Sequence, residues 1–215
     1  MTKQDVVLPL NVGDWLAPSM LTLDPGGTTG WAYYSHPLKR VTCGQLGPHD
    51  HHVELLDMIR RVAEGDELDL VYEQFEFRQN GVVIQQALSR LVEELKAGLI
   101  NSRGTIIATL ERIADIRPGR DKLVLTSREY IGMAKQAAQL DPNITLYSQS
   151  ASQAKTFVND TKLDALDWLR PTRGLEHARD ALRHLCRHSI TEYRPGNPIL
   201  KVWLEMSRRS RQIKV

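Results

Sequence analysis

Two acidic residues stand at the ends of short apolar segments, where an ionised side chain is uncommon. Asp24 follows the apolar run Met20–Leu23 and precedes the small, turn-prone segment PGGTTG (25–30). Glu73 lies near the end of LDLVYEQF (68–75), in which Leu68, Leu70 and Tyr72 alternate with Asp69, Val71 and Glu73. Charged residues are rarely placed in such strands without a partner. An aspartate before a glycine-rich turn also commonly bonds its own backbone, so Asp24 alone does not identify a site.

Two further titratable residues share one side of a predicted helix near the C-terminus. His177 and Asp180 are three residues apart in EHARDALRHLCRHS (176–189), and this spacing places them on the same side of a helix. If the strands that end in Asp24 and Glu73 are parallel neighbours, the two carboxyl groups meet at one edge of the sheet. A helix packed across that edge would add its own two side chains. We therefore predict three carboxylates and an imidazole in one place.

The chemistry of this predicted cluster is that of a metal site. Carboxylates a few ångströms apart repel one another, so they either protonate or bind cations. Hard oxygen ligands with open positions suit Mg²⁺ or Mn²⁺, and a histidine ligand favours Mn²⁺ slightly. Two such ions roughly 4 Å apart form a site for in-line attack on a phosphodiester. The predicted ligands are Asp24, Glu73, His177 and Asp180.

The elements that position these residues are strands and helices in alternation. The segment LTLDPGGTTGWAYY (21–34) predicts a β-hairpin with a glycine-rich turn. Further strands are expected at 40–46, 68–75 and 144–147, and helices at 49–63, 82–100, 126–140, 176–189 and 199–215. Short helical pieces, broken near Asn159, are expected between residues 150 and 168. This order predicts an α/β fold.

The length and composition of the chain set its domain organisation. A chain of 215 residues fits one domain with room for an insertion. We expect an irregular N-terminal extension at 1–19, a central domain at 20–190 with an insertion near 101–122, and a basic C-terminal extension at 191–215. There is no apolar run long enough for a membrane span, no signal-peptide pattern, and only two cysteines. These features predict a cytoplasmic protein.

Positive charge is concentrated in the last third of the chain. From Gln153 onward there are 13 Lys and Arg residues against 7 Asp and Glu, a net charge of +6, whereas the whole chain carries +2. Arg179, Arg183 and Arg187 recur every fourth residue along one face of the predicted helix at 176–189. Such a region suggests a polyanionic partner, although a merely solvated surface has the same composition.

Three motifs in this order resemble those of a known family. The segments LTLDPGGTTGWAYY, VYEQF and HARDAL are similar to the motifs of RuvC-type Holliday-junction resolvases of the ribonuclease H-like superfamily, in phage or bacterial versions. The resemblance covers about residues 19–100 and 144–190. It implies a ribonuclease H-like fold, with a central mixed sheet of about five strands, the first three as an antiparallel meander, flanked by helices. It also makes Asp24, Glu73, His177 and Asp180 the catalytic metal ligands.

The same resemblance implies an activity and a partner. The expected enzyme is a two-metal-ion endodeoxyribonuclease that resolves four-way DNA junctions by paired symmetric nicks, leaving 5′-phosphate and 3′-hydroxyl ends. Two nicks need two sites related by a twofold axis, which implies a homodimer. In this family an aromatic residue that follows the Glu-Gln pair inserts into the junction, and the nearest aromatics here stand at a different offset. The candidate DNA contacts are Lys155, Lys162, Arg179, Arg183, Phe75 and Phe77.

Other functions stay open at this point. A ribonuclease H-like nuclease that acts on flaps or on RNA–DNA hybrids has the same motifs, and so does a catalytically dead nucleic-acid-binding module. The segment DPGGTTG also resembles the phosphate loop of actin-like sugar kinases and ATPases, but those proteins have two such domains and this chain has one such loop. His184, one turn beyond Asp180, is expected to be a satisfied histidine at the helix edge and not a ligand.

Overall fold

The computed structural model describes residues 5–11, 15–47, 51–63, 67–74, 89–90, 92–94, 96–98 and 120–212. The chain divides into two compact units, one made of Met1–Phe75 with Thr126–Val215 and the other of Glu76–Leu125. The sheet and the candidate site belong to the first unit. Most of the predicted helix at 82–100, nearly all of the insertion at 101–122, and both Phe75 and Phe77 lie outside the described residues.

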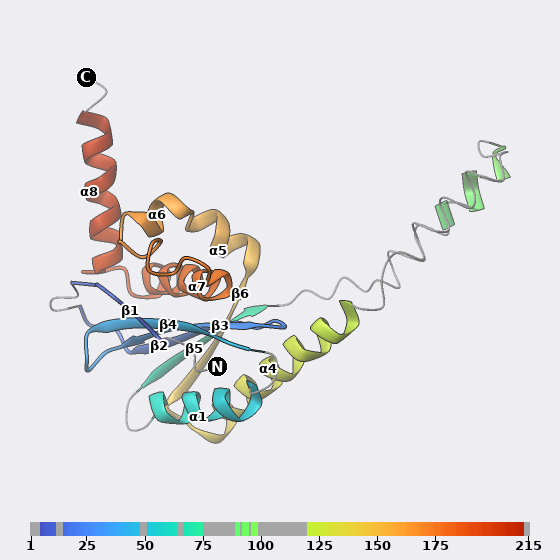
Figure 1. Cartoon of the computed structure of the whole chain (residues 1–215), viewed down its shortest axis with the longest axis horizontal. Helices are drawn as coiled ribbons and strands as arrows, with labels where there is room; N and C mark the ends of the chain where they lie inside the picture. Colours follow the sequence, from blue (N-terminus) through green and yellow to red (C-terminus); the bar gives the residue numbers. More distant parts are fainter. Residues whose placement is uncertain are drawn as a thin grey trace. The chain divides into compact units, whose positions relative to one another are not determined.

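A six-stranded mixed sheet forms the centre of the first unit (Figure 1). Its strands lie side by side in the order β1-β4-β3-β2-β5-β6. β2, β3 and β4 form the predicted antiparallel meander, whereas β5 is parallel to β2 and β6 is parallel to β5. The strands are β1 (Val6–Leu8), β2 (Ser19–Asp24), β3 (Thr29–Ser35), β4 (Arg40–Leu46), β5 (Leu68–Gln74) and β6 (Ile144–Ser150). The predicted α/β class with a mixed sheet is confirmed.

The N-terminal extension differs from the sequence-based expectation. The sequence predicts an irregular segment at residues 1–19, but Val6–Leu8 forms an edge strand in which Val6 lies opposite Cys43 of β4. Leu8 is buried in the core. A strand of three residues that ends before a proline has too short an alternation to be recognised from sequence, and its pairing with β4 is what stabilises it. Within the described residues, the sheet therefore has six strands and not about five.

Helices cover both faces of the sheet. Figure 1 shows α5, α6 and α7 on one side of the sheet and α1 and α4 on the other. The helices predicted at 49–63, 176–189 and 199–215 are confirmed within a few residues, whereas α4 begins directly after Gly119, six residues before its expected start at Thr126. The helices are α1 (His51–Ala63), α4 (Arg120–Leu140), α5 (Ala151–Phe157), α6 (Asp160–Asp164), α7 (Glu176–Glu192) and α8 (Pro198–Gln212).

The alternation of side chains along β2 assigns each residue to one of two cores. Met20 packs into the core beneath α7, whereas Leu21 and Leu23 pack into the core beneath α1 and α4. Burying each of these side chains fully contributes about 1.5–3 kcal/mol. Because neighbouring residues of a strand point to opposite faces, this register directs Asp24 to the α7 face of the sheet.

Close packing fixes the position of α7 on the sheet. Ala178 and Ala181 are fully buried, and their small side chains let the helix approach the strands closely. The hydroxyl of Thr22 donates a hydrogen bond of 2.7 Å to the carbonyl oxygen of Ala181. At Gly30 of β3, an added Cβ atom would overlap the carbonyl group of His177. The first turn of α7 therefore lies directly against the backbone of β3.

None of the helices in the described part of the chain combines the length and the apolar character that crossing a membrane requires.

Candidate active site

Asp24 and Glu73 come from neighbouring strands and lie at the same end of the sheet. β2 and β5 are parallel, with Leu23 opposite Tyr72, so Asp24 and Glu73 follow at adjacent positions. This parallel pairing is the condition on which the sequence-based site depends, and it is confirmed. Asp24 is only 7% exposed, so its carboxyl group is held in a largely dry environment between the sheet and α7.

His177 joins Asp24 from the first turn of α7. Its Nδ1 atom lies 2.8 Å from Oδ2 of Asp24, and its backbone N–H donates a hydrogen bond of 2.9 Å to Oε1 of Gln45. Burial raises the pKa of the Asp24 carboxyl, and the charges of Glu73 and Asp180 raise it further, while His177 opposes the shift. The hydrogen bond to Asp24 in turn raises the pKa of His177. The pair is therefore electrostatically linked to the other two predicted acids.

Glu73 has a buried partner that sequence reasoning does not assign to the site. The ring nitrogens of His184 lie 3.1 Å from Oε2 of Glu73 and 3.1 Å from Oε1 of Gln149 on β6. The side chain of His184 is 1% exposed. The expectation that His184 is satisfied within the fold is confirmed, but one of its partners is a candidate metal ligand. The sequence signal is its spacing of seven from His177 and four from Asp180, which puts all three on one side of α7.

Asp180 has a cation at each carboxylate oxygen. Nζ of Lys155 lies 2.9 Å from Oδ2, and Nη1 of Arg183 bonds Oδ1. Arg183 also bonds Asp160 through Nη2 and the carbonyl oxygen of Val158 through Nε. Asp180 raises the pKa of Lys155 through this hydrogen bond, and the charges of Glu73 and Asp24 contribute in the same direction. The Lys155 ammonium group therefore interacts electrostatically with all three carboxylates.

The four predicted ligands offer the oxygen and nitrogen donors that a divalent cation binds, but their side chains do not surround a common position. Among the described residues, no group of three or more His, Cys, Asp or Glu side chains is arranged so that it could hold a metal ion. The carboxylates nevertheless act on one another, since Glu73 and Asp180 both raise the pKa of Asp24. Partly buried carboxylates that repel one another need a cation, and here Lys155 and Arg183 supply positive charge at Asp180.

A second polar cluster anchors the other end of α7. Nε2 of His188 lies 2.7 Å from Oδ2 of Asp69 on β5, and the hydroxyl of Tyr193 donates a 2.7 Å hydrogen bond to the same oxygen. Asp69 and His188 are both buried. Burial and the charge of Asp69 raise the pKa of Tyr193. This cluster ties the C-terminal part of α7 to the beginning of β5, away from the candidate site.

The predicted DNA contacts fall into two groups. Lys155, Arg179 and Arg183 line one cleft of about 620 Å³, which Asp180, Asn159, Asp160 and Thr161 also line. Lys162 is engaged elsewhere: its ammonium group lies 4.8 Å from the ring centroids of both Phe157 and Trp203. Arg183 is held by the ion pairs described above and is only 14% exposed. A phosphate-binding role for these residues stays a prediction, and Lys155 is the most accessible of them.

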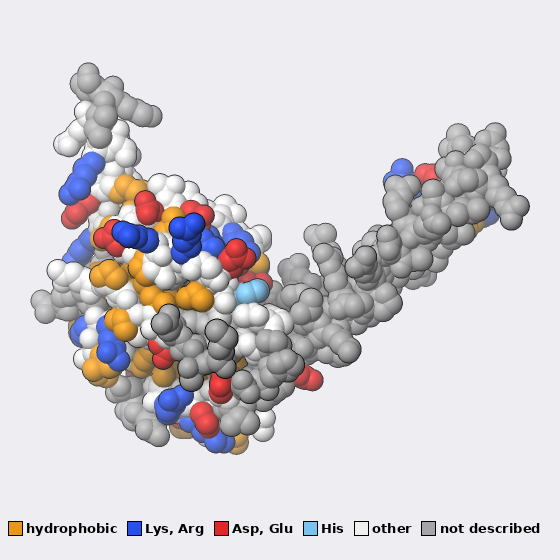
Figure 2. All heavy atoms as spheres, in the orientation of Figure 1, with side chains coloured by type: hydrophobic (Ala, Val, Ile, Leu, Met, Phe, Trp, Pro, Cys, Tyr) orange, Lys and Arg blue, Asp and Glu red, His pale blue; other side chains and the backbone are white. Residues whose placement is uncertain are grey.

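Charge of both signs surrounds this cleft. On the face shown in Figure 2, Lys and Arg side chains alternate with Asp and Glu over the region of α5, α6 and α7. A strand of nucleic acid that approached this face would therefore meet basic groups interspersed with acids, and its position would depend on individual contacts more than on a uniform field.

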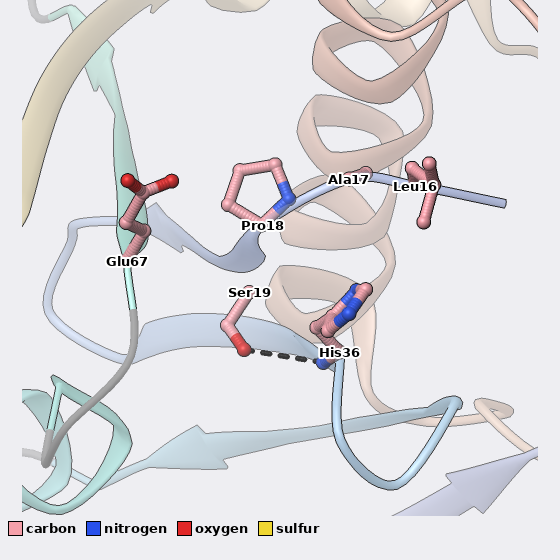
Figure 3. A pocket seen from close by; sticks show the side chains of 6 residues that line it. All are labelled: Leu16, Ala17, Pro18, Ser19, His36 and Glu67. Atoms are coloured by element: carbon pink, nitrogen blue, oxygen red, sulfur yellow. Dashed lines mark hydrogen bonds between the residues drawn. The ribbon is translucent and has the colours of Figure 1, made fainter.

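Another cavity lies at the opposite end of β2, beside Ser19. Figure 3 shows the side chains around this cavity of about 360 Å³, with the backbone N–H of His36 donating to Oγ of Ser19. Its lining residues are Leu16, Ala17, Pro18, Ser19, His36 and Glu67. One acid and one histidine stand among small and apolar groups there, so the cavity does not repeat the convergence of acids seen at Asp24.

Comparisons with protein-family models, with curated proteins and with solved structures found no match to this chain.

Proposed function

We propose that the chain is a metal-dependent endonuclease of the ribonuclease H-like kind, which cleaves branched DNA and resolves Holliday junctions by paired symmetric nicks. One observation carries the proposal. Asp24 and Glu73 lie at adjacent positions on parallel strands, and α7 brings His177 to within 2.8 Å of Asp24 and Asp180 into electrostatic range of it. Glu73 and Asp180, which belong to two other segments, thus lie within electrostatic range of Asp24 at one end of the sheet.

The architecture supports the fold assignment. The antiparallel meander β2–β3–β4, which the resemblance implies, is followed by β5 and β6, which run parallel to β2. In parallel α/β sheets, functional residues gather at the carboxyl ends of the strands. Asp24 is the last residue of β2, and Glu73 is the last but one of β5. The candidate ligands thus occupy the expected end of the sheet.

The proposed metal ligands divide between two ions. Asp24 would be shared, Glu73 would serve one ion, and Asp180 with His177 would serve the other. When bound, Mg²⁺ or Mn²⁺ would lower the pKa of the attacking water and stabilise the leaving 3′ oxygen. The mutual repulsion of the carboxylates and their partial burial support a requirement for divalent positive charge at this position.

Neighbouring residues hold these ligands in position. His184 orients Glu73, and Arg183 fixes one oxygen of Asp180. In the tautomer that donates Nδ1–H to Asp24, His177 presents Nε2 as a cation ligand or as a proton acceptor. Partners of this kind fix the orientation and basicity of metal ligands, and their removal typically costs about 10- to 100-fold in affinity or activity.

The substrate and the assembly follow from the reaction. Symmetric cleavage of a four-way junction needs two sites related by a twofold axis, so the proposed active form is a homodimer. Lys155 and Arg179 would hold phosphates beside the acids, in the cytoplasm of a bacterial or phage-infected cell. A nuclease for flaps or RNA–DNA hybrids, and a binding module without activity, are the alternatives that the test must separate.

Substitution of Asp24 by Asn tests the proposal. The variant should bind a four-way junction with the wild-type affinity but lose cleavage by at least about 10³-fold, because the shared carboxylate is gone. Asp57→Asn, at an exposed position of α1 on the other face of the sheet, is the matched control and should cleave normally. Cleavage of a mobile junction, a flap, a plain duplex and a hybrid is measured with Mg²⁺ and with Mn²⁺. Full activity of Asp24→Asn would exclude the metal mechanism, and preference for the flap or the hybrid would exclude junction resolution.

A further inference from the structure

The two cations at Asp180 differ in how firmly they are held. Arg183 bonds Asp180, Asp160 and the carbonyl oxygen of Val158, and its side chain is 14% exposed. Lys155 reaches Asp180 from the last turn of α5 through a side chain that is 55% exposed. Arg183 is therefore a fixed part of the fold, whereas Lys155 makes a contact that solvent can replace.

The energetics of the two contacts favour exchange at Lys155. An ion pair with one half-exposed partner contributes little, because water solvates the ammonium group nearly as well as the carboxylate does. Breaking the contacts of Arg183 would instead leave a largely buried guanidinium without its partners. A divalent ion carries twice the charge of an ammonium group and would interact with Asp24 and Glu73 as well as Asp180. Such an ion therefore competes best for Oδ2 of Asp180, the oxygen that Lys155 contacts.

We propose that Lys155 is a displaceable counter-cation of Asp180, which occupies the carboxylate while no divalent ion is bound and leaves it when the ion arrives. The inference rests on the proposed function, since it requires a divalent ion at Asp180. One oxygen of Asp180 bonds Arg183 and the other bonds Lys155, so the Lys155 contact is the one that an ion would replace.

The displaced ammonium group remains beside the cleft that Arg179, Asn159 and Thr161 line. There it becomes available to a phosphate of the bound strand, because it no longer neutralises Asp180. Ion binding and strand binding are then coupled: each favours the arrangement in which Lys155 has left the carboxylate, so each strengthens the other.

Chemical labelling of the unmodified chain tests the displacement directly. Lysines are acylated with an N-hydroxysuccinimide ester, and the rate at each site is measured by mass spectrometry with and without Mg²⁺. The rate at Lys155 should rise about two- to fivefold with Mg²⁺, because an ion-paired ammonium group loses its proton less readily than a solvated one. Lys135, exposed on α4 at the other face of the sheet, is the internal control and should not change. An unchanged rate at Lys155 under Mg²⁺ saturation would overturn the inference.

Calorimetric titration with Mg²⁺ separates this inference from the proposed function. Lys155→Gln should bind the ion about fivefold more tightly than the wild type, because no ammonium group has to be displaced. Lys135→Gln should bind like the wild type. Equal or weaker binding by Lys155→Gln, with normal binding by the wild type, would overturn the counter-cation role and leave the nuclease proposal intact. Absence of Mg²⁺ binding by the wild type would overturn both.

Discussion

Asp24 and His177 each shift the pKa of the other in the candidate site. His177 has a raised pKa because it bonds the Asp24 carboxylate. Replacing Asp24 with Asn should therefore lower the pKa of His177, which NMR titration of the imidazole Cε1–H signal would measure. Asp57→Asn should leave that titration unchanged. A His177 pKa that does not fall in Asp24→Asn would contradict the pairing.

The same pair makes stability depend on pH in a defined direction. The folded-state pKa of His177 lies above its ordinary value of about 6.5. The stabilisation of the fold by protonated His177 is therefore complete below pH 6.5, and it is lost as the pH rises through the folded-state pKa. This stabilisation also disappears at low pH, below the raised pKa of Asp24, because the Asp24 carboxylate is then protonated. His177 is partly exposed, so we expect the melting temperatures of wild type and His177→Gln to differ only by about 2 °C near pH 6.5 and to converge at higher pH.

Much of the candidate site is predictable at the level of single residues. Asp24 and Glu73 are recognisable because a charge at the end of an apolar strand needs a partner, and His177 and Asp180 because helical spacing puts them together. The role of His184 is not predictable, since its partners Glu73 on β5 and Gln149 on β6 lie 111 and 35 residues away in the chain. Sequence spacing shows which side of α7 a residue occupies but not which strand it meets.

At the scale of secondary-structure elements, the contact between β3 and α7 determines the site. Gly30→Ala should be strongly destabilising, by about 3 kcal/mol or more, because the added methyl group would overlap the backbone of His177 and force α7 off the strand. The measurement is urea unfolding, followed by the far-ultraviolet circular dichroism signal. Displacement of α7 would also separate His177 from Asp24, so the proposed junction cleavage should fall with stability.

Another glycine provides the matched control for this substitution. Gly132 lies in the interior of α4, and a Cβ atom built there has nothing within 4 Å. Gly132→Ala should stabilise the protein by up to about 1 kcal/mol, because alanine is the better helix former. If Gly30→Ala were tolerated as well as Gly132→Ala, the close contact between β3 and α7 would be wrong.

Elements with a clear period are predictable from the sequence, and those stabilised by distant partners are not. β2 to β5 follow apolar alternation or continuous apolar runs, and α7 follows a helical stripe of Ala178, Ala181 and Leu185. β1 carries only three residues, and its existence depends on pairing with β4. The predicted start of α4 is too late because basic residues after Pro118-Gly119 suggest a loop, although Arg120 to Leu125 contains no helix-breaking residue.

At the scale of the whole molecule, the basic C-terminal part packs on the core beneath α7 and is not a separate tail. Ile199 and Trp203 of α8 are buried with α7 in one core, and the indole N–H of Trp203 donates a 2.9 Å hydrogen bond to the carbonyl oxygen of Lys162. The Lys162 ammonium group also lies over the ring of Trp203 in a cation–π contact. The N-terminal part of α8 is therefore held on the core. Its C-terminal part carries Arg208 and Arg209 at exposed positions.

In the proposed binding of DNA, these two arginines should contribute to affinity through charge alone. Removing one phosphate contact reduces the slope of log affinity against log salt by about 0.9, so Arg208→Gln with Arg209→Gln should reduce it by about 2, with no change in melting temperature. Fluorescence anisotropy of a labelled junction from low to high salt measures the slope. The paired control, Arg60→Gln with Arg61→Gln, removes the same charge from exposed positions of α1 on the other face of the sheet and should leave the slope unchanged. Equal reductions in both double variants would mean that DNA senses only the net charge, and that α8 has no specific part in binding.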